Sequence, residues 1–374
     1  MQLYLHIPFC KKKCAYCDFN SSACADEAFV FGYLTALKRE IAFAAAAYPY
    51  AEIKTVYIGG GTPSLLSCGQ FESVMRALSD SFGGFSPRET TVEVNPESLS
   101  SEKLSVYRDC GVNRISMGVQ SLNDDNLRRI GRLHDAKLAL EKAELAARYF
   151  DNVSADFIIG LPYDTEKTVE REIEAMAPYV EHMSVYELTL EAGTPLARDA
   201  ESGGVLLPTD DETADFLDIA ADTLLGAGFS RYEVSNFAKQ GRECTHNLGY
   251  WTREEYVGLG AGAHSLVKTA DGKTPLNREL RFANPKNAHA YMGGVNCVKS
   301  FGDIPRAEFS VIDAREAECE EIMLGLRTAR GVRSELLEGK ITDRIKDFFQ
   351  SENGRTSLTR RGFEVMNSVL TEII

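Results

Sequence analysis

The strongest constraint on the fold is an alternation of short strand-like runs with helix-length segments. Six runs are rich in β-branched and other apolar residues: 3–7, 55–58, 91–94, 114–119, 154–159 and 183–190. The segments between them, such as 26–47, 135–149 and 166–177, place apolar residues three and four positions apart, as an amphipathic helix does. This alternation is typical of parallel strands joined by right-handed crossovers. Even with 231–234 as a further strand the count stays below eight, so we expect an α/β fold, a partial (open) parallel β/α barrel.

Beyond residue 238 the alternation fails. Residues 240–275 are rich in glycine and polar side chains, and 277–300 show no clean period, whereas helical patterns return at 314–329, 335–337, 342–350 and 359–371. We therefore predict a barrel over 1–238, an extension over 239–301 and a small, mainly helical C-terminal domain over 302–374. A linker is expected near 302–305.

Composition bounds the class of protein. At 374 residues and 44% hydrophobic content the chain can bury a proper core, and it has no apolar run of the roughly 20 residues that a membrane span needs. Nine cysteines without an export signal predict reduced thiols or metal ligands in a cytoplasmic protein. Lysine and arginine total 41 against 55 acidic residues, a net charge of -14 that argues against general nucleic-acid binding.

Three of the cysteines form a compact loop directly after the first strand. Cys10, Cys14 and Cys17 are separated by three and two residues, so their sulfurs can converge on one metal centre. Zinc would need a fourth ligand, for which His6 and Cys24 are available but poorly spaced. Three thiolates on a cubane cluster leave one iron open to a small molecule, so the spacing favours an iron-sulfur cluster over zinc.

Polar and glycine residues mark the ends of the later strands. Gly59-Gly60-Gly61-Thr62-Pro63 follows the second strand, and Glu93, Gln120 and Asp156 lie in or after later ones. Taken singly, each is more simply a turn or a hydrogen-bonding residue of the fold. Because ligands bind at the carboxyl ends of the strands in such sheets, their grouping beside the cysteine loop predicts a site.

Ordered motifs extend these features into a family resemblance. The cysteine loop and the glycine run resemble the radical S-adenosylmethionine superfamily. Further motifs narrow this to the oxygen-independent coproporphyrinogen III oxidases and their relatives, the haem chaperones. They are Tyr4-x-His6-Ile7-Pro8-Phe9-Cys10, Val92-Glu93-Val94-Asn95-Pro96-Glu97, Ser116-Met117-Gly118-Val119-Gln120-Ser121 and Asp156-x3-Gly160-Leu161-Pro162.

The resemblance implies cofactors and their residues. In that family the three cysteines hold a 4Fe-4S cluster, whose open iron is chelated by S-adenosylmethionine. A low-potential electron donor reduces the cluster, and breakage of a carbon-sulfur bond then gives a 5'-deoxyadenosyl radical, chemistry that belongs to the cofactor. By resemblance, Tyr4, Gly60 and Glu93 contact this cofactor and Tyr16 is an aromatic residue of the site. The positions that match a second cofactor molecule in the oxidases are Gly61, Thr62, Gln120, Arg132 and Asp156.

Three features favour the chaperone branch over the oxidases. The oxidases carry a further cysteine where this chain has Phe19, and they carry an extension where only three residues precede Tyr4. His246-Asn247-x-x-Tyr250-Trp251 matches a motif that is associated with haem binding in the chaperones, and a histidine can ligate haem iron. A single histidine in a polar loop is ordinarily a surface or hydrogen-bonding residue, so haem ligation by His246 is a hypothesis.

The expected function is accordingly that of a haem chaperone, which binds haem as cargo and delivers it to client haemoproteins. The alternative is an oxygen-independent coproporphyrinogen III oxidase, and a weaker one is a radical enzyme with another substrate, so enzyme activity is left open. The run Gly258-x-Gly260-Ala-Gly262-Ala263-His264 lacks the strand and helix of a dinucleotide fingerprint, and we expect it to line the site.

Overall fold

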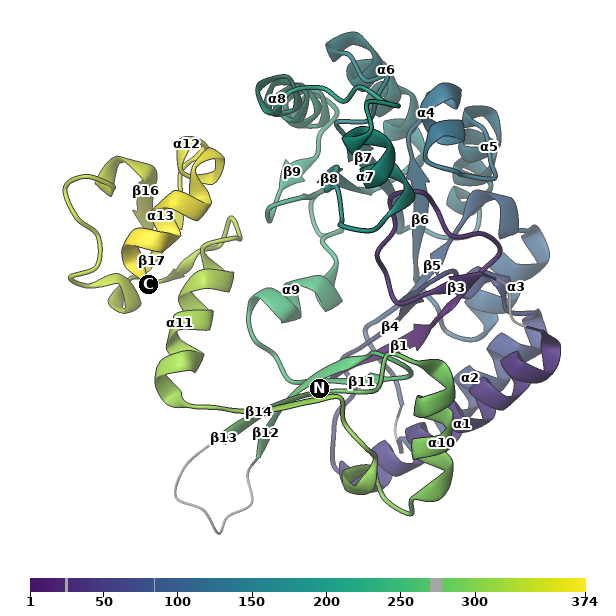
Figure 1. Ribbon diagram of the computed structural model, residues 1–374. Coiled ribbons are helices and arrows are strands. Elements are labelled where there is room, and N and C mark those ends of the chain that lie inside the picture. Colours follow the sequence, from purple (N-terminus) through teal and green to yellow (C-terminus); the bar gives the residue numbers. More distant parts are fainter. Residues whose placement is uncertain (24–25, 84, 270–277) are drawn as a thin grey trace.

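The computed structural model describes residues 1–23, 26–83, 85–269 and 278–374 (Figure 1). Across this part of the chain a twelve-stranded sheet forms the centre of the molecule. Its middle strands run parallel and correspond to the runs that the sequence predicted. They are β1 (Gln2–Ile7), β4 (Thr55–Gly60), β5 (Glu89–Val94), β6 (Arg114–Gln120), β7 (Val153–Ile159) and β8 (His182–Glu187). The fold is the open, partial β/α barrel that the sequence predicted.

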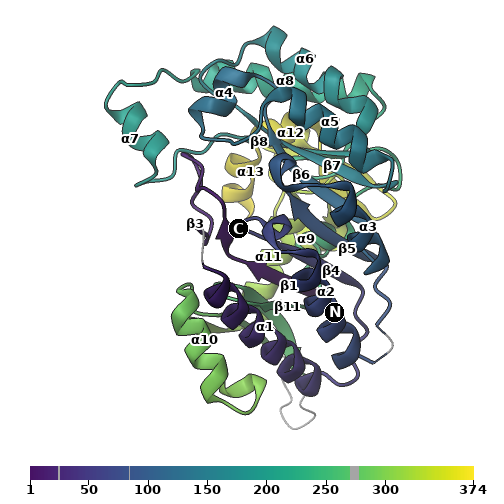
Figure 2. The ribbon, with the colours of Figure 1, turned by 90° about the vertical axis from the view of Figure 1, so that its right-hand side faces the viewer.

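Helices cover the outer face of the sheet (Figures 1 and 2). The longest begin where the sequence provides a capping side chain, as at Ser67, Thr165 and Thr209, each of which accepts from a backbone N–H of the first turn. The helices joining the strands are α1 (Glu27–Ala47), α2 (Cys68–Ser81), α3 (Ser101–Asp109), α4 (Asp124–Arg129), α5 (Ala136–Ala147) and α6 (Glu166–Met176). After β8 follow α7 (Pro195–Glu201) and α8 (Asp210–Gly226).

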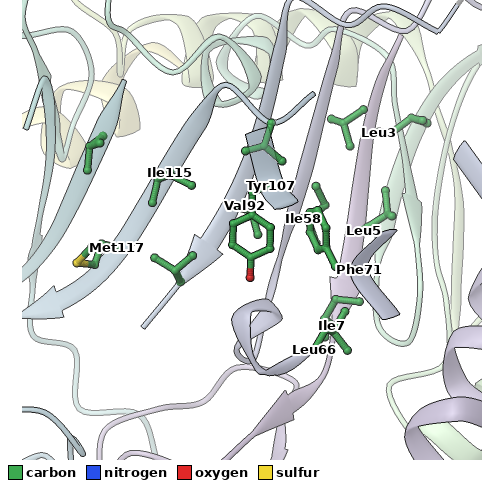
Figure 3. Packing of buried hydrophobic residues seen from close by; sticks show 14 of the residues in the cluster. Leu3, Leu5, Ile7, Ile58, Leu66, Phe71, Val92, Tyr107, Ile115 and Met117 are labelled. Carbon is green, nitrogen blue, oxygen red and sulfur yellow. The ribbon is translucent and has the colours of Figure 1, made fainter. Parts of the chain in front are cut away.

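The core lies between the parallel strands and these helices (Figure 3). Leu3, Leu5 and Ile7 point from β1 toward the helices, and each buried aliphatic side chain of this kind contributes about 1.5–3 kcal/mol. Because neighbouring residues of a strand face opposite sides, Tyr4 and His6 face the interior of the barrel. The same alternation on the other strands supplies the rest of this core layer: Ile58, Val92, Ile115 and Met117, packed with Leu66, Phe71 and Tyr107.

Both ends of the parallel sheet depart from the prediction. The seventh strand expected at 231–234 is wrong, because β9 (Ser230–Arg231) and β10 (Asn236–Ala238) form an antiparallel hairpin beside β8. On the other side β11 (Tyr256–Leu259) pairs parallel with β1, although the sequence indicated irregular structure there. The sheet then continues antiparallel through β12 (His264–Thr269), β13 (Arg278–Ala283) and β14 (Glu308–Ile312). Gly258 permits the close approach of β11 and β12, since a Cβ there would lie 2.1 Å from the carbonyl oxygen of His264.

The C-terminal part has its own hydrophobic cluster, which includes Leu326, Leu358 and Leu370. Its elements are α11 (Ala314–Gly325), β15 (Val332–Arg333), β16 (Phe349–Glu352), β17 (Arg355–Leu358), α12 (Arg360–Glu364) and α13 (Met366–Ile373). The helix predicted at 342–350 is wrong, since a 3-10 turn and β16 replace it, and the last helix divides at Val365.

The linker predicted near 302–305 is not a loose connection. Phe301 and Ile304 are buried in the main core, close to α10 (Ala288–Cys297), which packs beside α1 (Figure 2). The division into 1–238, 239–301 and 302–374 stays a prediction. Within the described residues no helix is both long and apolar enough to span a membrane.

Candidate functional site

The cysteine loop lies at the carboxyl edge of the barrel strands. After β1 the chain forms β2 (Phe9–Cys10), which pairs with β3 (Ser22–Ala23) and so brackets the loop. The amide of Ala15 donates to the carbonyl of Ile130 at 2.8 Å, and its carbonyl accepts from Leu196 at 2.9 Å. These bonds fix the middle of the loop against two other strand connections. Cys10 is buried, whereas Cys14 and Cys17 are partly exposed.

Two of the three thiols receive hydrogen bonds from polar side chains of the site. The hydroxyl of Thr62 donates to Cys10 Sγ at 3.7 Å, and Arg132 Nη1 donates to Cys14 Sγ at 3.6 Å. Asn95 joins the two donors, because its Nδ2 donates to Thr62 at 3.2 Å and its Oδ1 accepts from Arg132 at 2.9 Å. Donors aimed at sulfur stabilise the thiolate, which is the form that binds metal.

The donor set fits a cluster better than a single ion. Among the described residues, no three His, Cys, Asp or Glu side chains converge as a site for one metal ion. A cubane does not require such convergence, because each thiolate binds a different iron. Of the two residues considered as a fourth zinc ligand, His6 has both ring nitrogens engaged, by Tyr4 at 3.0 Å and by the carbonyl of Asn20 at 2.7 Å. Cys24 lies outside the described residues.

A glycine run and a partly buried glutamate adjoin the cysteines. Gly60 has a φ of 118°, and its amide donates to Glu93 Oε2 at 3.0 Å, while Tyr57 donates to Oε1 at 2.9 Å. Burial raises the pKa of Glu93 to about 7, against the opposing effect of these two bonds. A Cβ on Gly61 would lie 2.7 Å from the carbonyl oxygen of Phe9 and 3.0 Å from Cys10 Sγ, so glycine leaves open the space beside this thiol.

The interior of the barrel carries further strained or buried polar groups. Gln120 ends β6 with a φ of 71°, a conformation that costs energy for a residue other than glycine and that clusters at functional sites. Asp156 accepts from the hydroxyl of Ser116 at 3.2 Å, and burial raises its pKa. Both side chains face the same space as Glu93.

One cavity of about 600 Å³ collects the three cysteines and the residues predicted to bind a cofactor or haem, but not the run Gly258–His264. Its lining includes Cys10, Cys14, Cys17, Tyr4, Tyr16, Gly60, Gly61, Thr62, Glu93, Gln120, Arg132, Asp156 and His246. The residues come from five parallel strands, from the connections that follow them, including the cysteine loop, and from α9 (Thr245–Trp251), which lies between the sheet and the C-terminal part (Figure 1). Their individual roles stay predictions.

His246 lines this cavity, but its side chain is buried and both of its ring nitrogens are hydrogen-bonded. Its ring nitrogens contact Thr55 Oγ1 at 2.7 Å and the Tyr250 hydroxyl at 2.9 Å, and the residue is only 1% exposed. Burial lowers the pKa of His246 to about 3, so the imidazole is neutral. Direct ligation of a haem iron by His246 would therefore require the hydrogen bond with Tyr250 or with Thr55 to break, so that one ring nitrogen could bind the iron. Trp251, from the same motif, is not among the residues lining the cavity.

A second cavity of about 690 Å³ adjoins the first. Gly262, Ala263 and His264 of the glycine-rich run line this second cavity and not the first, and Met323 and Leu324 contribute from α11. The residues that line both cavities are Tyr4, Phe19, Gly60, Glu93 and Tyr250.

Comparison with known proteins places the chain in a family. The model of the radical SAM superfamily matches residues 4–176. "Heme chaperone HemW" of Bacillus subtilis (strain 168) is 36% identical over 93% of this chain and 89% of its own length. The protein of the same name from Mycobacterium tuberculosis (strain H37Rv) is 33% identical over 100% of this chain and 94% of its own. The chain belongs to the HemW family.

A solved structure supports the fold of this HemW-family chain. Coproporphyrinogen III oxidase from Escherichia coli, described as a radical SAM enzyme, superposes with a TM-score of 0.82. The comparison covers 100% of this chain and 89% of that one, at 21% identity, and so concerns the fold alone.

Sequence reasoning missed several residues of the site in this HemW-family chain. Arg114, 2% exposed, lines the first cavity together with Tyr57 and His182. No spacing pattern marks them, although a charged residue opening an apolar strand was an available signal for Arg114. His264 was visible within the glycine-rich motif but had no assigned role.

Proposed function

We propose that the chain is a haem chaperone that carries a 4Fe-4S cluster, binds S-adenosylmethionine and delivers haem to client haemoproteins. The observation that carries this proposal is its 33–36% identity, over nearly the whole chain, to relatives named heme chaperone. Phe19, where the oxidases have a further cysteine, supports the same branch.

Cys10, Cys14 and Cys17 would hold the cluster. Thr62 and Arg132 would donate hydrogen bonds to two of these sulfur ligands and so help to orient them. When reduced by a low-potential electron donor, the cluster supplies an electron to the sulfonium of S-adenosylmethionine.

Glu93 is the residue best placed to receive the cofactor's ammonium group, since its carboxylate is buried and pairs with no cation in the structure's described part. Tyr4 and Gly60 would complete the contacts around it. The remaining predicted cofactor residues are Tyr16, Gly61, Thr62, Gln120, Arg132 and Asp156, which line the same cavity.

We retain the prediction that His246 takes part in haem binding. Its contacts support a role through Tyr250 and not direct contact with the iron. Its Nε2 lies 2.9 Å from the hydroxyl of Tyr250, which lines both cavities. In this arrangement His246 positions Tyr250, and the ring of Tyr250 contacts the cargo.

Two measurements on one anaerobic, cluster-reconstituted preparation test the function. A haem titration should show stoichiometric binding with a Soret band, and the loaded protein should transfer haem to an apo-haemoprotein. Coproporphyrinogen III, supplied with S-adenosylmethionine and a reductant, should remain unchanged. Formation of protoporphyrinogen IX without haem binding would instead establish the alternative, an oxygen-independent coproporphyrinogen III oxidase.

A further inference from the structure

The chain has six histidines, and four of them have both ring nitrogens engaged within the protein. Their partners are side-chain or backbone oxygens at 2.7–3.3 Å, so none of the four offers a free nitrogen to a ligand. They are His6, His134, His182 and His246.

The two remaining histidines differ in what surrounds them. His289 lies on α10, where its ring packs against Phe29 at an interplanar angle of 56° with centroids 4.6 Å apart, and it lines neither of the two cavities. His264 opens β12, is exposed, and forms no ring hydrogen bond with a described residue. It lines the second cavity, so an imidazole that is not hydrogen-bonded to any described residue faces that space.

The walls of the second cavity suit a flat, largely apolar ligand. Tyr250 and Tyr256 meet edge to face with ring centroids 4.7 Å apart, and Leu266, Met323 and Leu324 add aliphatic surface. A volume of about 690 Å³ is in the ordinary range for a cofactor pocket.

Cationic groups are also present at this cavity. Arg253 and Arg281 both line it, and both are paired with Glu320, at 2.9 and 2.7 Å. The side chain of Arg281 is 35% exposed against 7% for Arg253, so Arg281 is the more accessible of the two. A carboxylate of a bound ligand can replace Glu320 on Arg281 without leaving either charge in an apolar environment.

We propose that the second cavity is the haem site and that His264 is the axial ligand of the iron. The assignment rests on the proposed haem-binding function and gives it a location. The imidazole binds the iron, Tyr250, Tyr256 and the aliphatic side chains contact the macrocycle, and Arg281 receives a propionate. His246 is then a positioning residue that acts through Tyr250.

Titration of the full-length, cluster-reconstituted protein with ferric protoporphyrin IX tests this assignment. In His264→Ala we expect haem binding about 10- to 100-fold weaker, with a shifted Soret band and an altered spin state in the electron paramagnetic resonance spectrum. Added imidazole should restore the wild-type spectrum, because it can replace the lost ligand but cannot repair a misfolded wall. His289→Ala, the other histidine with a free ring, should leave affinity and spectrum unchanged.

The outcomes separate the inference from the function on which it rests. A wild-type protein that binds no haem refutes the haem-chaperone function, and the site with it. Wild-type binding with an unchanged His264→Ala spectrum refutes only the ligand assignment. The spectrum could instead change in His246→Ala, recover with added imidazole, and stay unchanged in His264→Ala. That outcome would show that His246, in the first cavity, is the iron ligand.

Discussion

Glu93→Gln should make the protein more stable and weaken its binding of S-adenosylmethionine. Glutamine keeps the size of the side chain, and its amide can accept from Gly60 and donate to the Tyr57 hydroxyl, which can act as donor or acceptor. The substitution therefore preserves both local hydrogen bonds and removes only the negative charge.

The stability effect depends on pH. Because folding raises the pKa of Glu93 from 4.5 to about 7, its neutral form is favoured in the folded protein. Its contribution to stability is complete below about pH 4.5, falls as the pH rises, and is lost above about pH 7, a total of about 3 kcal/mol. Glu93→Gln lacks this titration, so its stability relative to wild type should increase between pH 5 and pH 8.

The binding effect has the opposite sign. A hydrogen bond to a charged group is worth about 1.5–3 kcal/mol, so loss of the carboxylate should weaken cofactor binding by about 10- to 100-fold at pH 7.5. In the wild-type protein the affinity should fall below pH 7, as Glu93 takes up a proton and loses its charge.

Urea unfolding without S-adenosylmethionine, and anaerobic calorimetric titration with it, measure the two effects. Glu172→Gln is the matched control: burial raises its pKa to about 7 as well, and Ser121 and Leu122 donate to it, but it does not line the first cavity. This control should reproduce the pH-dependent gain in stability and leave cofactor affinity unchanged. If the advantage of Glu93→Gln did not grow with pH, or if its affinity matched wild type, the reasoning would be refuted.

The other predictions concern the cluster loop and the wall between the cavities. Cys10→Ser should abolish the cluster's visible absorption after anaerobic reconstitution, whereas Cys68→Ser, on α2, should retain it. Gly61→Ala should destabilise the protein by about 1–3 kcal/mol in urea unfolding, because the new Cβ would lie 2.7 Å from a backbone oxygen; unchanged stability would contradict the close packing. Tyr250→Phe keeps the ring but removes the 2.9 Å contact with His246, and it should cost about 1 kcal/mol, with weaker haem binding by titration; equal haem affinity would refute the positioning of this ring by His246.

The parallel part of the fold could be predicted because its signals are local. The runs at 55–58 and 154–159 are short and rich in β-branched and other apolar residues, and helix-length segments separate them. Tyr256–Leu259 could not be recognised in the same way, since it is short and contains Gly258. That glycine is required by a contact with His264 that exists only after β11 and β12 pair.

The same distinction applies to the site. The cysteine spacing is local, and strand-end residues such as Glu93 gather because parallel strands end at one edge. Whether the ring nitrogens of a histidine are hydrogen-bonded depends on the tertiary structure. Thr55, which is 191 residues away in sequence, forms a hydrogen bond with one ring nitrogen of His246. Sequence alone therefore could not distinguish His246, whose two ring nitrogens are hydrogen-bonded, from His264, whose ring has no hydrogen bond with a described residue.

The shared wall of the two cavities connects the proposed cofactor and cargo. Tyr4, Gly60 and Glu93 line both spaces, so a cofactor bound to Glu93 changes the charge and packing of a surface that haem would also contact. Any effect of S-adenosylmethionine on haem affinity must be matched by an equal effect of haem on cofactor affinity, since the two share one coupling free energy. Loss of the carboxylate in Glu93→Gln removes the charged part of that wall, whereas the ring of Tyr4 remains. The chain can thus make haem retention depend on the occupancy of the cofactor site through contacts that are already in place.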